Sequence, residues 1–137
     1  MPPNRVTSGS AEGWLARARG SLALAKGPRS EEVFLEDQCF LAQQAAEKAM
    51  KAVYQHRGLV FRYTHDLEEL GKGLEDKDVL LPDAVKDAVI LTRYAFETRY
   101  PGPFEPVTED EYKEAMRLAG CVVDWAGQII QERAKKK

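Results

Sequence analysis

The sequence of 137 residues lacks several features that mark common protein classes. Its two cysteines and two histidines show no CxxC or Cys/His spacing typical of a zinc site. No stretch approaches the ~18 apolar residues of a membrane span. Glycine-rich phosphate loops, HExxH helices, GxSxG elbows and acidic metal clusters do not occur in it. We therefore expect neither a bound metal nor another cofactor.

The charge balance is close to even. The formal net charge is -2, which disfavours a uniformly basic nucleic-acid binder and leaves room only for local basic patches. Cys39 and Cys121 lie within apolar helical patterns, so we interpret them as small buried side chains. This use of cysteine fits a reducing compartment and predicts a cytoplasmic protein.

The chain length fits one domain that can bury its own core. We expect residues 1–10 to form a flexible N-terminal tail, since they lack the apolar core of a signal peptide. Residues 11–133 should form a helical bundle, and residues 134–137 a basic C-terminal tail.

Helical periodicity dominates the sequence and strand patterns are nearly missing. Ser10 and Ser30 are suited to cap two helices, and the stretch TEDE, with Thr108 and Glu111, is a capping box. The pattern predicts helices over about 11–26, 31–57, 82–100 and 109–133, with a short one over about 65–71. We therefore predict an all-α, up-and-down bundle of four to five helices.

The predicted helix over 31–57 should be central, because apolar residues cover two of its strips. We expect Glu47 and Lys51 to pair on its wetter face. Gln43 and Gln44 could form hydrogen bonds across a helix pair. The connector over 57–63 is unusually apolar, and it should either tuck against the bundle or form part of an interface.

Five residues are candidates for a ligand site. His65, in the stretch THDLEEL, could act as a base or contact phosphate, or it could only help to start a helix. Lys48 could hold a phosphate or simply be solvated. Arg93, Arg99 and Tyr100 precede Pro-Gly-Pro at a helix end, where they could bind a ligand or form a surface Glu–Arg pair beside tyrosines at the core edge.

The two arginines do not form a ready fork for one phosphate. Arg93 and Arg99 are six residues apart, which turns them far from each other on an ideal helix, whereas Arg93 and Tyr100 share a face. A site built from both arginines therefore needs a second copy of the chain or a ligand that bridges the gap.

Three stretches in this order, CFLAQQAAEKAMKAV, HDLEEL and YAFETRYPG, resemble the HEPN domain family. The resemblance covers about Trp14 to Ile130. It implies a bundle of four to five helices that forms a two-fold homodimer. Many small stand-alone members are encoded beside a minimal nucleotidyltransferase (MNT), and the pair behaves like a toxin–antitoxin system.

Some branches of the family are metal-independent endoribonucleases that carry Arg-x(4–6)-His near a helix end. Counted from Arg93, that histidine would fall on Thr98, Arg99 or Tyr100, and no histidine follows Arg93. The RYP form resembles a branch linked to nucleotide binding. We therefore expect a nucleotide-binding and partner module of an MNT-type nucleotidyltransferase, with a ribonuclease toxin of degenerate or displaced site as the alternative. RNA is a second possible ligand, and no membrane partner is expected.

Overall fold

The structure is a computed structural model in which residues 10–96 and 106–135 are described. These residues form helices and connecting segments, with no strand in either range. The helices are α1 (Ala11–Ala25), α2 (Leu35–His56), α3 (Leu67–Glu75), α4 (Asp83–Asp87), the 3₁₀ helix η1 (Ala88–Thr92), α5 (Arg93–Phe96) and α6 (Glu109–Lys135). The predicted all-α class is confirmed.

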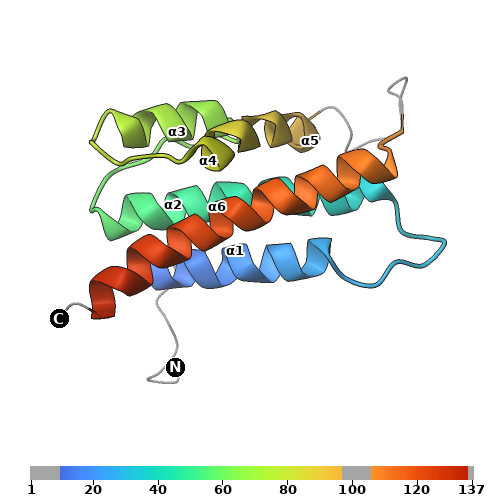
Figure 1. Cartoon of the computed structure of the whole chain (residues 1–137), viewed down its shortest axis with the longest axis horizontal. Coiled ribbons are helices and arrows are strands. Elements are labelled where there is room, and N and C mark those ends of the chain that lie inside the picture. Colours follow the sequence, from blue (N-terminus) through green and yellow to red (C-terminus); the bar gives the residue numbers. More distant parts are fainter. Residues whose placement is uncertain (1–9, 97–105, 136–137) are drawn as a thin grey trace.

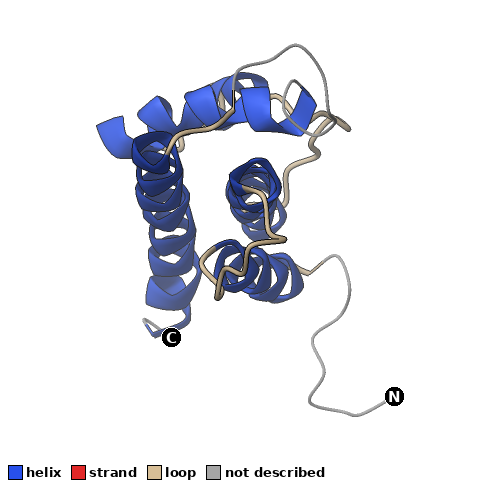
Figure 2. Ribbon diagram, turned by 90° about the vertical axis from the view of Figure 1, so that its right-hand side faces the viewer, coloured by secondary structure: helices blue, strands red, loops and turns tan. Residues whose placement is uncertain are grey.

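Three long helices, α1, α2 and α6, run side by side, and α2 lies between α1 and the short helices, whereas α6 packs directly against α4 and η1 (Figure 1). Viewed along the bundle, α3, α4, η1 and α5 form a layer across one side of the long helices (Figure 2). In α2, 13 of 22 residues are buried, which confirms that this helix is central. Alanines fill much of its surface, so α1 and α6 can approach closely.

The start of α2 differs from the prediction. The helix begins at Leu35 rather than near Glu31, and Ser30 accepts a hydrogen bond from the Glu32 amide in a local turn instead of capping a helix. Arg29 pairs with Glu109 at the start of α6, and its guanidinium lies 4.7 Å from the centre of the Tyr112 ring. These long-range contacts hold the connector outside the helix.

Helix α3 is longer than predicted, and Asp66 is its N-cap. Asp66 accepts hydrogen bonds from the amides of Glu68 and Glu69, and the helix continues through both glycines to Glu75. Close packing explains the glycine at 73, since a Cβ there would lie 2.1 Å from the hydroxyl oxygen of Tyr54. That hydroxyl donates to the carbonyl of Leu70 at 2.7 Å, so α3 sits directly on α2.

The predicted single helix over 82–100 is wrong within the described residues, because η1 separates α4 from α5. The spacing of the buried residues gives a physical reason. Val85, Ala88, Leu91 and Tyr94 are three residues apart. A 3₁₀ helix stacks such residues on one face, whereas an α-helix turns them gradually away. Phe96 falls on the apolar face of the helix that the sequence predicts over 82–100, but its side chain is 58% exposed.

Several local predictions are confirmed. Ser10 caps α1, and Thr108 and Glu111 exchange hydrogen bonds at 3.1 and 2.9 Å as a capping box. Gly58 follows α2 with a φ of 68°, a conformation that suits glycine just after a helix end. The connector after α2 tucks against the bundle through Phe61, which packs on the ring of Trp14, whereas Val60 and Tyr63 are exposed. None of the described helices combines the length and the apolar character needed to cross a bilayer.

Candidate functional site: a buried carboxylate behind His65

The polar centre of the bundle is the ion pair between Glu47 and Lys51, which we expected on the wetter face of α2. Glu47 and Lys51 lie in the core, with only 5% and 6% of their surfaces exposed, and not on a wet face of α2. The Lys51 ammonium is 2.8 Å from Glu47 Oε2. It also lies 5.1 Å from the centre of the Phe61 ring, so both aromatic and acidic groups surround this cation.

His65 is the partner of Glu47 on the outer side. Its Nδ1 lies 2.8 Å from Glu47 Oε1, whereas 53% of the side chain remains exposed. The imidazole meets the ring of Phe96 edge to face, with the centres 5.9 Å apart. One nitrogen of His65 is thus anchored in the core, and the ring reaches the surface beside α5.

Two amides strengthen this anchor. Gln43 Nε2 donates to Glu47 Oε1 at 3.1 Å and to the backbone carbonyl of His65 at 3.0 Å. Gln44 in turn donates to Gln43 Oε1 at 2.8 Å. The backbone next to His65 is held from η1 as well, because Thr92 Oγ1 accepts from the Leu67 amide. Both the main chain and the side chain of His65 are therefore fixed in place.

The Glu47 carboxyl is held in its ionised form. Burial alone would raise its pKa, but hydrogen bonds from Lys51 and then His65 outweigh burial and bring the pKa below its ordinary value. An ionised carboxylate can only accept hydrogen bonds. The Nδ1 atom of His65 must therefore carry the proton in this contact.

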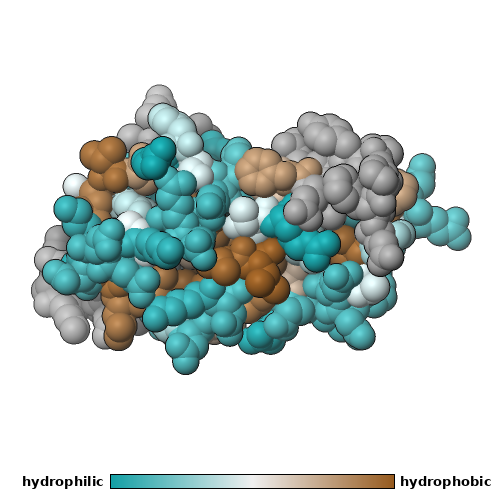
Figure 3. Space-filling view, turned by 90° about the horizontal axis from the view of Figure 1, so that it is seen from above, coloured by the Kyte–Doolittle hydropathy of each residue, from teal (hydrophilic) through white to brown (hydrophobic). Residues whose placement is uncertain are grey.

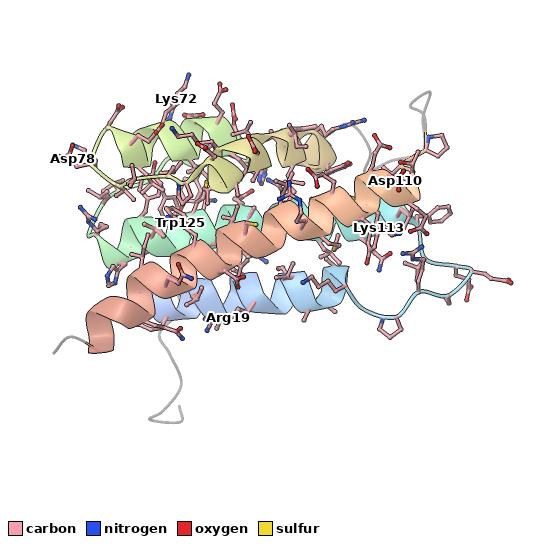
Figure 4. The ribbon with its side chains drawn as sticks, in the orientation of Figure 1. Arg19, Lys72, Asp78, Asp110, Lys113 and Trp125 are labelled. Carbon is pink, nitrogen blue, oxygen red and sulfur yellow. The ribbon has the colours of Figure 1, made fainter. Side chains whose placement is uncertain are left out.

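The other described i,i+4 ion pair of the bundle offers a contrast. Lys72 Nζ and Glu68 Oε1 on α3 are 3.7 Å apart, and both side chains are mostly exposed. Figure 4 shows Lys72 on the outer side of α3, pointing away from α2. Such a pair contributes little to stability, whereas the Glu47–Lys51 pair is shielded from water.

The layer around His65 has a mixed surface. Seen from above, it is largely hydrophilic with separate hydrophobic patches (Figure 3). Among the described residues, the exposed apolar side chains of this layer are Leu80, Ile90 and Phe96. A ligand that reaches His65 therefore meets an aromatic ring as well as polar groups.

Arg93 begins α5, one turn before Phe96. Its Nη1 lies 3.6 Å from Glu111 Oε2 on α6, and its guanidinium is 5.4 Å from the centre of the Tyr94 ring. Both side chains of the ion pair are more than 40% exposed, at 44% and 41%. Glu97, four residues after Arg93 and the acid of the surface Glu–Arg pair that the sequence suggests, lies outside the described residues, as do the candidate site residues Arg99 and Tyr100.

Two nearby groups are neutral at physiological pH. Burial raises the pKa of the Cys39 thiol to about 12, and burial likewise raises the pKa of the Tyr94 hydroxyl to about 12. A thiol in this state is a poor nucleophile. Neither the Cys39 thiol nor the Tyr94 hydroxyl is suited to acid–base or covalent chemistry near pH 7.

Lys48 is placed away from this arrangement. Its ammonium donates to Ser21 Oγ on α1 at 2.9 Å. Burial, followed by the charge of Arg17, lowers the pKa of Lys48. His65 thus contacts Phe96 of α5 and Arg93 begins the same helix, whereas Lys48 is directed toward α1.

A separate pocket of about 750 Å³ lies between the connector after α2 and α3. Its wall combines aromatic and aliphatic groups with charges of both signs, and it does not include His65 or Arg93. Within the described residues, no three side chains of His, Cys, Asp or Glu gather in a way that could hold a metal ion.

Comparison with protein families matches residues 11–130 to the HEPN domain. The chain belongs to the HEPN domain family. Among solved structures, TT1696 from Thermus thermophilus is 34% identical, with 86% of this chain and 96% of that chain covered and a TM-score of 0.73. ST0689, described as an archaeal HEPN homologue, is 26% identical, with coverage of 88% and 98% and a TM-score of 0.69. No curated protein matches the chain.

In this HEPN chain, Glu47 is the site residue that sequence reasoning missed. The burial of α2 is what marks this residue, because 13 of the 22 residues of the helix are buried and an acid and a base four residues apart then lie in the core. Gln43, Glu47 and Lys51 follow each other at that spacing, which places them in one row along the helix. A polar row on a helix that is buried all round predicts an internal network.

Proposed function

We propose that this HEPN chain is a nucleotide-binding and partner module of a minimal nucleotidyltransferase of the MNT type, in a two-component system that resembles toxin–antitoxin pairs. The observation that carries the proposal is the half-exposed imidazole of His65, which is fixed by a buried carboxylate beside the helix that bears Arg93. Firmly held polar groups next to an exposed aromatic ring are suited to bind a small polar ligand with a flat base.

The arginine supplies the phosphate contact in this proposal. A guanidinium presents donors in a fork that matches phosphate oxygens. The ion pair between Arg93 and Glu111 is exposed on both sides, and such pairs contribute only about 0–1 kcal/mol. A phosphate can therefore replace Glu111 at little cost, while Phe96 offers a ring on which a base can stack.

Isothermal titration with a panel of ribonucleoside mono-, di- and triphosphates tests the nucleotide half of the proposal. Wild-type protein should bind at least one of them, and Arg93→Ala and His65→Ala should each weaken that binding by about tenfold or more. Arg117→Ala is the matched control, because that arginine pairs with Glu114 elsewhere on α6. Absence of heat for every nucleotide, at protein concentrations that detect millimolar binding, would refute the proposal.

The partner half requires a separate experiment. The chain should form a homodimer by light scattering and should retain the product of the neighbouring gene in a pull-down if that gene encodes a small nucleotidyltransferase. Failure to retain it, with both proteins folded, would contradict the partner role even if nucleotides bind.

One observation favours a second function, a metal-independent endoribonuclease. A histidine whose Nδ1–H is held by a carboxylate is arranged as a general base, and such help contributes about 10²–10⁴ in rate. His65 would then take the proton of an attacking 2′-hydroxyl, and Arg93 would stabilise the charge on the phosphate. An RNA cleavage assay that compares wild type with His65→Ala and Arg93→Ala separates the functions, since equal background cleavage in all three would remove this alternative.

A further inference from the structure

The interaction between Glu47 and His65 determines which kind of hydrogen bond His65 can offer to a ligand. Because Nδ1 donates to the carboxylate, a neutral imidazole has its only other nitrogen, Nε2, without a proton. Nε2 can then accept a hydrogen bond but cannot donate one. A phosphate oxygen, which also only accepts, is a poor partner for that atom.

Lys51 is the cation that faces the Glu47 carboxylate from within the bundle. In a simple acid–histidine pair, the negative charge of the acid favours a proton on the second nitrogen. Here the Lys51 ammonium already balances the charge of Glu47 at 2.8 Å, and Gln43 shares Oε1 with His65. The carboxylate therefore has three donors and one compensating cation, and it needs no second positive charge.

We propose that Glu47 is a positioning residue that fixes His65 as a hydrogen-bond acceptor, so that the bound nucleotide places a hydroxyl or amino group, and not a phosphate, against Nε2. This inference rests on the proposed nucleotide binding and adds which part of the nucleotide each side chain contacts. Arg93 contacts phosphate, whereas His65 contacts the ribose or the base. Lys51 acts indirectly, through the charge of Glu47.

The protonation of His65 can be measured without any ligand. His56→Asn leaves a single imidazole, whose nitrogen signals can be assigned in ¹⁵N NMR at pH 8, where an ordinary histidine is neutral. The expected form carries its proton on Nδ1. In Glu47→Leu/Lys51→Met, which removes acid and base together, the proton should move to Nε2, the form preferred by free histidine. A proton on Nε2 in the otherwise wild-type background would overturn the inference.

The ligand side is tested by titration at pH 8 with one ribonucleoside triphosphate that binds, its 2′,3′-dideoxy form and its analogue without the exocyclic amino group. Loss of the group that donates to Nε2 should weaken wild-type binding about 3- to 10-fold. The analogue that binds more weakly shows whether that group is a ribose hydroxyl or the exocyclic amino group. In His65→Phe, which keeps the ring contact, all three should bind alike. Inorganic tripolyphosphate should bind wild type and His65→Phe equally.

The outcomes separate the inference from the function on which it rests. Equal wild-type affinity for all three nucleotides, or tripolyphosphate binding that weakens in His65→Phe, would overturn the inference and leave nucleotide binding intact. Absence of binding by every nucleotide would instead overturn the proposed function itself.

Discussion

Removal of Lys51 alone should destabilise the protein far more than removal of Lys51 together with Glu47. Lys51→Met keeps most of the volume and the contact with the Phe61 ring but leaves the Glu47 carboxylate without its cation. Both side chains are at least nine-tenths buried, so water cannot easily replace the lost partner. Loss of one partner from a buried pair typically costs about 3–5 kcal/mol.

The lower part of that range applies here, because Gln43 and His65 still donate to Glu47 in the variant. We expect a loss of roughly 3 kcal/mol in the free energy of unfolding, which for a domain of this size lowers Tm by about 10 °C. Glu47→Leu/Lys51→Met has no buried charge and should recover to within about 1–2 kcal/mol of wild type.

Urea denaturation of the wild type, Glu47→Leu, Lys51→Met and the double variant forms a double-mutant cycle for the interaction between the two side chains. Lys72→Met is the control, because its pair with Glu68 has the same i,i+4 spacing but is exposed, and it should change stability by less than about 0.5 kcal/mol. A Lys51→Met variant within about 1 kcal/mol of wild type would refute the reasoning. So would a double variant as unstable as the sum of its single changes.

Three further predictions concern a helix cap, a close glycine contact and the acid dependence that Glu47 contributes. Thr108→Ala removes one half of the capping box and should cost about 0.5–2 kcal/mol in urea denaturation, whereas Thr108→Ser should cost little. Gly73→Ala should cost about 1–3 kcal/mol, because its Cβ would strike the Tyr54 hydroxyl, and Tyr54→Phe should restore part of that loss; the control Gly20→Ala has open space and should stabilise α1. The folded-state pKa of Glu47 is lowered, so its contribution to stability is complete above about pH 5 and is lost as pH falls through the folded-state pKa. Stability measured from pH 7 to pH 3 should therefore fall more steeply for wild type than for Glu47→Leu/Lys51→Met, and parallel curves would contradict this.

Features that depend on a few neighbouring residues could be predicted from the sequence. Ser10 and the Thr108–Glu111 box cap helices through partners three residues away, so local chemistry is sufficient. The start of α2 could not be predicted in this way. The contact that holds its connector joins Arg29 to Glu109, which lies 80 positions further along the chain.

The candidate site shows the same limit. The sequence pointed to the stretch around His65 and to Arg93, but not to the Glu47 carboxylate that orients the His65 ring. Glu47 lies 18 residues before His65 and looked like half of an ordinary surface pair. Its role follows from the burial of α2 on all sides, which only the packing of α1, α3 and α6 around it reveals.

The 3₁₀ helix η1 also controls the direction of the helix that follows it. Over the five residues Ala88–Thr92, the 3₁₀ geometry adds about 2.5 Å of length and about a quarter of a turn compared with an α-helix. Arg93 directly follows η1, and with that rotation in place its guanidinium lies 3.6 Å from Glu111. The 3₁₀ turn of η1 thus contributes to the orientation in which α5, and Arg93 at its start, leaves the core.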